Sequence, residues 1–238
     1  DRESLAKTLS DETGKPIKEA LAEIDNIQIG VPAYVEKAKH DYGNVIYRGT
    51  EAGQENTIQY TIQQPLGVMV AIIPFNFPSD IFINKIPPAL IMGNSCILKP
   101  ASVNPLTLTK YVELLKEAGI PDGVIQVVHG SGGVVGTALT SNPDVAIVSL
   151  TGSTEAGIDA AQRVVEHCGH SSLELGGNDA FIICADGDLD LAVNETVWGR
   201  LYNTGQVCCA SKRFLVENSV KDEYIKKMVE KIKTLKVG

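Results

Sequence analysis

The hydrophobic positions at the start of the chain repeat with a helical period. Apolar side chains recur every three or four residues over 2–40, and the repeat is interrupted once, at Gly14-Lys15-Pro16. This spacing predicts two amphipathic helices joined by a turn. Residues 57–64 alternate between apolar and polar side chains, which predicts a half-exposed strand with its apolar residues on one face.

From residue 68 the pattern changes to short, wholly apolar runs, each followed by a helical period. Such runs are typical of a parallel sheet covered by helices on both faces. We therefore expect an α/β fold with an open, Rossmann-like sheet, whose ligands bind beyond the carboxyl ends of the strands. Ser79 is the expected cap of the first of these helices. The predicted strands are 68–73, 95–98, 124–128, 145–150 and 171–175, and the predicted helices are 79–92, 105–118, 133–140 and 153–166.

The alternation restarts after Gly176-Gly177. Two glycines permit a sharp change of direction, so we expect a domain boundary at this point and the start of a second α/β domain after it. The segments predicted there are a strand at 180–184, a helix at 189–202, a strand at 214–217 and a helix at 221–235.

Charge and composition narrow the range of partners. The formal net charge is −8 at pH 7, whereas nucleic acid binding needs a basic surface, so we expect no nucleic acid partner. No apolar run reaches the roughly 18 residues of a membrane span. Five cysteines without a CxxC pair indicate a reducing compartment, which we take to be the cytoplasm. The four histidines show no metal-ligand spacing, and no metal is expected.

Polar residues or glycines stand at the end of every predicted strand of the first sheet. Asn76 follows the first strand, Lys99 ends the second, and the glycine-rich segment 130–136 follows the third. Thr151-Gly152-Ser153 follows the fourth strand, and Glu174 lies at the end of the fifth. Because the carboxyl ends of parallel strands share one edge of a sheet, we expect these residues at one site.

Two of these segments suggest phosphate binding with different strength. The segment 130–136 does not match G-x-G-x-x-G, because residue 135 is Val, and it is weak on its own. Thr151-Gly152-Ser153 at the start of a helix can direct backbone N–H groups at a phosphate. The alternative is that Ser153 is an ordinary helix cap.

Glu174 and Asn76 each have a chemical and an ordinary interpretation. Glu174 lies between two leucines, where a buried carboxylate is costly unless it is paired or acts as a base. It could instead face water from an edge strand. Asn76 lies between two aromatic residues and two prolines, and its amide could stabilise an oxyanion or simply belong to a turn.

Residues 203–213 place two adjacent cysteines, Cys208 and Cys209, in a polar, turn-like segment. A cysteine that only packs normally has apolar neighbours, and an arbitrary cysteine is more often such a structural thiol. Here Lys212 and Arg213 follow closely. Nearby positive charge favours the thiolate, which is the nucleophilic form, and together with the strand-end residues it favours a catalytic interpretation.

Five motifs together resemble the aldehyde dehydrogenase superfamily, in order and spacing, over nearly the whole chain. They are Pro74-Phe-Asn76-Phe-Pro78, Leu98-Lys99-Pro100, Leu150-Thr-Gly152-Ser153-Thr154, Leu173-Glu174-Leu-Gly-Gly177 and Gly205-Gln206-Val-Cys208…Arg213. The resemblance implies an NAD(P)-binding domain over 1–176 with an oligomerisation arm at about 46–64. It implies the N-terminal part of a catalytic domain over 177–238.

The resemblance also implies individual roles. Cys208, the second residue after Gly205-Gln206, would be the nucleophile, with Cys209 as its neighbour. Glu174 would be the general base and Asn76 the oxyanion donor. The residues expected to bind NADP or NAD are Ile73, Pro74, Lys99, Ser102, Gly132, Gly152, Ser153 and Leu175.

The reaction implied is oxidation of an aldehyde to a carboxylic acid through a thiohemiacetal and a thioester on Cys208. Because the family's acylating branch lacks the carboxylate, Glu174 implies hydrolysis of the thioester rather than transfer to coenzyme A. NAD-specific members usually carry Glu three residues after the lysine, and Ser102 stands there instead. NADP is therefore expected to serve at least as well as NAD. Asn84, on the helix that follows Asn76, favours a small polar aldehyde or semialdehyde.

Two other interpretations remain open. A cysteine-dependent hydrolase would need a histidine partner for the thiol, and we expect none near these loops. A catalytically incomplete nucleotide-binding fragment would keep the fold without turnover, since the family has further segments before Asp1 and after Gly238. The whole protein is expected to be a homo-oligomer, a dimer or tetramer, whose partner is a small aldehyde.

Overall fold

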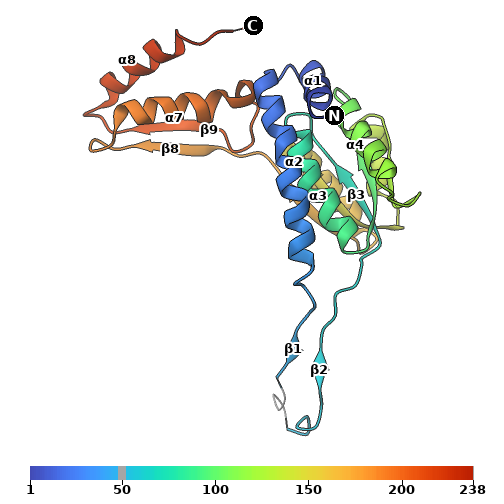
Figure 1. Ribbon diagram of the computed structural model, residues 1–238. Helices are drawn as coiled ribbons and strands as arrows, with labels where there is room; N and C mark the ends of the chain where they lie inside the picture. Colours follow the sequence, from blue (N-terminus) through green and yellow to red (C-terminus); the bar gives the residue numbers. More distant parts are fainter. Residues whose placement is uncertain (48–51, 238) are drawn as a thin grey trace. The chain divides into compact units, whose positions relative to one another are not determined.

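The computed structural model describes residues 1–47 and 52–237 (Figure 1). The chain folds as two compact units, Asp1–Glu174 and Leu175–Gly238. We call them the first and the second unit and describe each by itself. Among the described residues, no helix combines the length and the apolar character that crossing a membrane requires.

A five-stranded parallel sheet forms the centre of the first unit. Its order is β5-β4-β3-β6-β7, and every neighbouring pair is parallel. The expected parallel α/β fold is therefore confirmed. The strands are β3 (Val68–Ile72), β4 (Ser95–Lys99), β5 (Ile125–Val127), β6 (Val145–Thr151) and β7 (His170–Glu174).

The direction of the chain across this sheet reverses between β5 and β6. The connections from β3 to β4 and from β4 to β5 run one way, and β6 then returns to the other side of β3 and continues to β7. Since such crossovers are right-handed, the two sets of helices lie on opposite faces. α3 (Pro78–Ile91) and α4 (Leu106–Glu117) cover one face; α5 (Thr137–Thr140) and α6 (Thr154–Val165) cover the other.

Two N-terminal helices form an outer layer over α3 and α4 (Figure 1). They are α1 (Arg2–Thr13) and α2 (Ile17–Ala38), as the apolar pattern predicts. α1 ends at Gly14, whose φ of 71° is the left-handed conformation that glycine adopts without strain. The main core lies between these four helices and the sheet, where apolar side chains such as Leu9, Met69 and Ile86 are buried.

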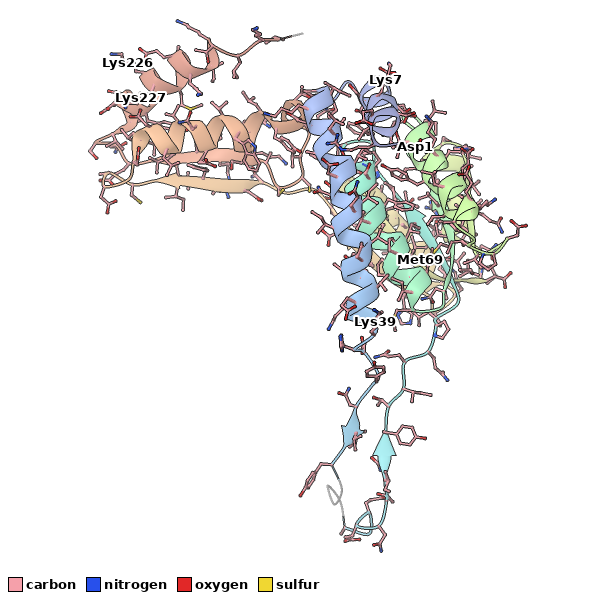
Figure 2. The ribbon with its side chains drawn as sticks, viewed as in Figure 1. Asp1, Lys7, Lys39, Met69, Lys226 and Lys227 are labelled. Carbon is pink, nitrogen blue, oxygen red and sulfur yellow. The ribbon has the colours of Figure 1, made fainter. Side chains whose placement is uncertain are left out.

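An arm extends from the sheet of the first unit between α2 and β3. Its two short antiparallel strands are β1 (Val45–Ile46) and β2 (Gln59–Tyr60). The strand expected at 57–64 is shorter than predicted, since only Gln59 and Tyr60 belong to it, and its apolar face is not buried. Ile58, Tyr60 and Ile62 are each more than 60% exposed, because neither face of the arm packs on the core (Figure 2). Residues 48–51 of the expected arm lie outside the described residues.

The second unit contains one parallel strand pair and two longer helices. β8 (Asp179–Ile183) pairs with β9 (Ser211–Val216), and α7 (Leu189–Leu201) packs against α8 (Lys221–Ile232). β9 begins three residues before the predicted strand, because Ser211 already pairs with Asp179 across the two strands. A single turn of 3₁₀-helix, η2 (Tyr202–Gly205), connects α7 to the cysteine segment.

Two further expectations differ from the structure. Ser79 does not cap α3: it lies inside the helix, and its N–H donates to a carboxylate oxygen of Glu23 at 2.7 Å. The predicted helix 133–140 begins with a π-helical turn, η1 (Gly132–Gly136), before α5. Three glycines in five residues weaken the regular α-helical repeat there.

The N-terminus of α4 depends on a side chain from a distant part of the sequence. The Glu12 carboxylate, at the end of α1, accepts from the N–H of Leu106 at 2.5 Å and of Thr107 at 2.9 Å. It also accepts from the Thr107 hydroxyl at 2.7 Å. α4 has no side-chain cap of its own, so Glu12 serves as its cap.

We predict that Glu12→Ala lowers the free energy of unfolding by about 1–2 kcal/mol, because two N–H groups of the α4 terminus lose their acceptor. Urea unfolding measures this loss. Glu113→Ala is the matched control, because Glu113 is an exposed glutamate of α4 that lies away from the helix terminus. It should change the stability by less than about 0.5 kcal/mol. Equal effects of the two substitutions would contradict the capping role.

Candidate active site

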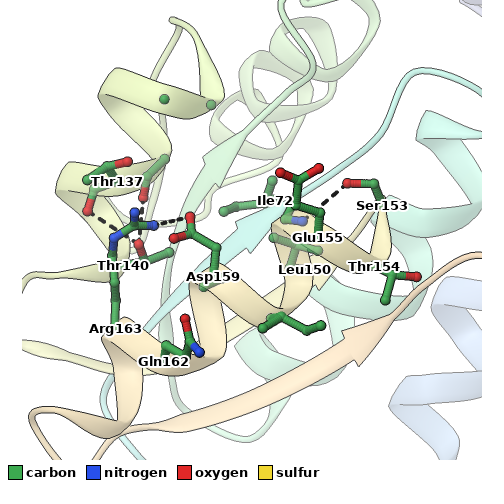
Figure 3. A pocket seen from close by; sticks show the side chains of 16 residues that line it. Ile72, Thr137, Thr140, Leu150, Ser153, Thr154, Glu155, Asp159, Gln162 and Arg163 are labelled. Carbon is green, nitrogen blue, oxygen red and sulfur yellow. Dashed lines mark hydrogen bonds and ion pairs between the residues drawn. The ribbon is translucent and has the colours of Figure 1, made fainter.

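An open cleft of about 960 Å³ lies where the direction of the sheet reverses (Figure 3). Ile72 at the end of β3 and Leu150 near the end of β6 form its floor, and η1, α5 and α6 form its walls. This is the position at which open parallel sheets bind ligands. Of the predicted cofactor-binding residues, Gly132 and Ser153 line the cleft.

The N-terminus of α6 opens on this cleft. The Ser153 hydroxyl caps the helix by accepting from the N–H of Ala156 at 3.2 Å (Figure 3). An added Cβ at Gly132 or Gly133 would meet no atom within 4 Å, so the glycines leave the space in front of the helix open. Free helix-terminal N–H groups facing open space suit an anionic ligand such as a phosphate.

The far wall of the cleft carries charges that the sequence pattern did not point out. Asp159 and Arg163 form an ion pair one turn apart on α6 (Figure 3). Thr137 and Thr140 face it from α5. None of these residues belongs to a recognisable motif, and only the helical spacing of Asp159 and Arg163 could have indicated their pairing.

The loop after β3 carries three of the predicted site residues. Ile73 is buried, and its N–H donates to the Lys99 carbonyl at 3.1 Å, which extends the pairing of β3 with β4. Pro74 and Asn76 follow it and are half-buried. Because the Ile73 side chain points into the core cluster, it can contribute to a ligand site only through its backbone.

Lys99 and Ser102 lie on the next loop along the sheet edge. Lys99 is buried, its ammonium donates to the Pro100 carbonyl at 2.9 Å, and burial lowers the pKa of the amine. Ser102 is exposed, and its hydroxyl donates to the Gly130 carbonyl at 3.0 Å. The Ser102 proton is therefore already engaged with the glycine-rich segment.

Glu174 ends β7 opposite Thr151, and its carbonyl accepts from the N–H of Gly152 at 3.0 Å. Its side chain is exposed. Of the two interpretations of Glu174, this unit agrees with a side chain that faces water, because β7 is an edge strand. The edge brings Gly152 and Glu174 together through the backbone.

Lys85 is a candidate that the sequence analysis missed. It lies on α3, is buried, and its ammonium donates to the Ser149 hydroxyl of β6 at 2.8 Å. Burial lowers the pKa of this amine to about 8, and the Glu174 carboxylate opposes that shift. A strongly shifted amine near the carboxyl edge is a candidate functional group, although buried structural networks shift pKa values as well. Lys85 stands between Asn84 and Ile86 in the predicted helix and belongs to no motif, so the pattern alone gave no signal.

The predicted nucleophile belongs to the second unit. Cys208 and Cys209 are both exposed free thiols. The pKa of Cys209 is raised, mainly by the partial burial of its thiol and further by the neighbouring Cys208. The backbone of Gly177 lies so close that an added Cβ would meet the Cys208 carbonyl oxygen at 2.7 Å. Glycine is required there for this close approach and not for a turn.

The positive charges near Cys208 are directed elsewhere. Lys212 donates to the Gly177 carbonyl, and Arg213 donates to the Asn178 carbonyl at 3.2 Å. The expectation that both residues favour the Cys208 thiolate is not supported by these contacts, since they fasten β9 to the start of β8. Leu175, the last predicted cofactor residue, is half-buried at the start of the same unit.

The structure thus brings Gly132 and Ser153 to one cleft, and Gly152 and Glu174 to one pair of strand ends. That Cys208 joins them remains a prediction, because it lies in the other unit. Within the described parts of the chain, we find no group of three or more His, Cys, Asp or Glu side chains arranged to hold a metal ion.

Comparison with known proteins places this chain in one family. A model of the aldehyde dehydrogenase family matches residues 1–238. A succinate-semialdehyde dehydrogenase [NADP(+)] of Escherichia coli K12 is 39% identical over all of this chain and 48% of its own length. A glutarate-semialdehyde dehydrogenase of Pseudomonas putida is 39% identical, over all of this chain and 49% of its own length.

Solved structures agree with this result. An Escherichia coli NADP-dependent enzyme has a TM-score of 0.94 at 39% identity, with all of this chain and 48% of that chain aligned. A betaine aldehyde dehydrogenase of Staphylococcus aureus in complex with NAD+ has a TM-score of 0.95 at 34% identity, with 100% and 46% aligned. The chain belongs to the aldehyde dehydrogenase family. It spans about half the length of the curated relatives it matches.

The Lys85 pKa predicts a pH-dependent stability. An unfolded lysine titrates near 10.5 and the folded one near 8, so the unfolded state binds more protons between these values. The cost of burying the charged amine is present below pH 8 and disappears as the pH rises to 10.5.

Between pH 7.5 and 10.5, we expect wild type to gain stability relative to Lys85→Met. The gain in the free energy of unfolding should be on the order of 3 kcal/mol. Urea unfolding at a series of pH values measures it. Lys116→Met, at an exposed position of α4, is the control and should run parallel to wild type. A parallel curve for Lys85→Met would contradict the assignment.

Proposed function

We propose that the protein containing this chain oxidises a small, polar aldehyde to its carboxylic acid with NADP or NAD. The observation that carries the proposal is the cleft at the reversal of the sheet, lined by Gly132 and the α6 terminus, in a chain of the aldehyde dehydrogenase family. In this proposal residues 1–176 bind the cofactor. Residues 177–238 are the N-terminal part of the catalytic domain.

The cleft fits a dinucleotide on structural grounds. The α6 terminus and the glycines of η1 offer backbone N–H groups and open space for a pyrophosphate, with Gly152 and Ser153 beside it. Lys99 and Ser102 lie on the neighbouring loop and would hold the adenosine ribose. Ile73, through its backbone, and Pro74 and Leu175 would also contact the cofactor. When bound, the cofactor supplies a hydride acceptor.

Three residues would carry the covalent chemistry. The Cys208 thiolate attacks the aldehyde carbon, and the Asn76 amide with the Cys208 N–H stabilises the oxyanion. Loss of hydride leaves a thioester on Cys208. Glu174 then takes a proton from the water that releases the acid, so that coenzyme A is not needed.

The names of the relatives support a small polar substrate. They include succinate- and glutarate-semialdehyde dehydrogenases, whose names specify short substrates. Asn84, which we expect near the aldehyde, is exposed, and its carbonyl oxygen accepts from the Tyr34 hydroxyl at 3.0 Å. That contact leaves the N–H₂ end of the amide as the donor for a polar substrate.

A nucleotide-binding protein without turnover is the second candidate, supported by the cleft alone, which lies in a different unit from the predicted nucleophile. The apolar arm side chains Val45, Tyr60 and Ile62 are exposed, which supports an oligomerisation role in the whole protein.

Five free cysteines support a reducing, cytoplasmic environment.

The nucleophile assignment can be tested in the full-length protein. We predict that Cys208→Ala abolishes NAD(P)H formation, while cofactor affinity stays within about twofold, because the thiol forms the bond to the substrate. Cys209→Ala is the matched control and should keep most of the activity. Iodoacetamide labelling that maps to Cys209 alone would contradict the assignment. Cofactor binding by wild type without acid product would select the second candidate.

The cofactor preference follows from position 102. We predict that wild type has a kcat/KM for NADP at least equal to that for NAD. Ser102→Glu should shift the NADP:NAD ratio towards NAD by about tenfold, because a carboxylate there repels a 2′-phosphate by on the order of 1 kcal/mol or more. Ser102→Ala is the control, since the wild-type hydroxyl proton is already given to Gly130. An unchanged ratio in Ser102→Glu would show that another residue decides.

A further inference from the structure

Buried side chains hold the backbone of the Asn76 loop at three places. The Asn104 amide donates to the Phe75 carbonyl at 2.9 Å. The Lys15 ammonium donates to the Asn76 carbonyl at 2.8 Å. The Glu23 carboxylate accepts from the N–H of Ser79 at 2.7 Å. These contacts come from three segments far from the loop in sequence, and together they fix its backbone on both sides of Asn76.

Lys15 and Glu23 form an ion pair whose two side chains are fully buried. Lys15 lies in the turn between α1 and α2, and Glu23 lies on α2. The Lys15 ammonium also lies 3.8 Å from the centre of the Phe77 ring, the residue after Asn76. Burial raises the pKa of Glu23, and Lys15 opposes that shift. Both charged groups therefore turn towards one short loop.

A buried ion pair of this kind needs an explanation beyond stability. Apolar residues of similar volume often replace such pairs without loss of stability, since removing two charges from water is costly. The helices α1 and α2 contribute Leu9, Ala20 and Ile24 to the apolar core, so buried apolar residues are the rule in this layer. Apolar side chains at positions 15 and 23 could not hydrogen-bond to the Asn76 carbonyl or the Ser79 N–H. The contribution of the two charged groups is therefore to fix the position of the loop.

We propose that Lys15 and Glu23 are positioning residues, which hold the Asn76 amide where it stabilises the oxyanion of the aldehyde adduct. The inference rests on the proposed function, in which Asn76 is the oxyanion donor. Neither residue touches the substrate. Asn104 supports the same loop from the segment before α4.

The test uses the full-length protein with the double substitution Lys15→Met/Glu23→Gln. Met keeps an apolar chain beside Phe77, and Gln keeps an acceptor for the Ser79 N–H, but the Asn76 carbonyl loses its anchor. We expect kcat to fall about 10- to 100-fold, as it does when an oxyanion donor is displaced, with KM for the cofactor unchanged. The melting temperature should stay within a few degrees of wild type.

Lys7→Met/Asp11→Asn is the matched control. It removes the same two charges from an exposed i, i+4 pair on α1 and should leave kcat unchanged. In an Asn76→Ala background, the Lys15/Glu23 substitution should cause no further loss, because its effect passes through the Asn76 amide. A further loss as large as in wild type would overturn the proposal, and so would an unchanged kcat in the first double variant.

Amide hydrogen exchange gives a second measurement that needs no activity. In Lys15→Met/Glu23→Gln we expect exchange to rise about tenfold or more in residues 75–80 and to stay unchanged in β4. Asn104→Ala, which leaves the ion pair intact, should raise exchange in the same segment. Unchanged exchange in residues 75–80 would overturn the positioning role, whether or not the wild-type protein oxidises an aldehyde. A wild-type protein that oxidised no aldehyde would by itself reject only the proposed function.

Discussion

The parallel pairing of β3 with both β4 and β6 is the constraint on which the first unit depends. Because all strands run the same way, every loop that leaves a carboxyl end emerges at one edge. The chain must also return across the sheet after β5, and this return leaves β3 and β6 side by side with helices on opposite faces. The cleft between their ends follows from this topology, before any particular side chain is considered.

The polar groups buried in this unit are concentrated near the same edge. Lys15 and Glu23 contact the loop after β3, Asn104 contacts it from the next loop, and Lys85 reaches Ser149 near the end of β6. An exposed pair such as Lys7 and Asp11 contributes little to stability, since water screens it. Buried polar groups must be hydrogen-bonded, and their requirement for partners fixes backbone that apolar packing would leave adjustable.

Much of the fold and part of the site could be predicted from the sequence. There is a physical reason why some features could be predicted and others could not. Segments with a clear pattern were correct in type. α4 has a helical period because one of its faces is buried, and β6 is an apolar run because helices cover both faces of the sheet. The positions of Asn76 and Glu174 at strand ends could be predicted because a parallel sheet brings the carboxyl ends of its strands to one edge, and their roles stay predictions. Lys15 and Glu23 were not, since a contact 61 residues away leaves no local pattern. For Glu174 a buried and an exposed side chain both stayed open, because the pattern could not show that β7 is an edge strand.

The second unit fixes the backbone around Cys208 by different means. Asn203 and Thr204 both have positive φ, 48° and 55°, which costs on the order of 1 kcal/mol or more for a β-branched residue such as threonine. The carbonyl of the buried Asn203 accepts from the N–H of Gln206 at 3.0 Å and from the Thr204 hydroxyl at 2.7 Å, which holds this turn in place. Past the turn, Gly177 lies against the Cys208 carbonyl. The backbone of the predicted nucleophile is thus constrained on both sides while its thiol stays exposed, an arrangement that suits attack on a small substrate better than packing in a core.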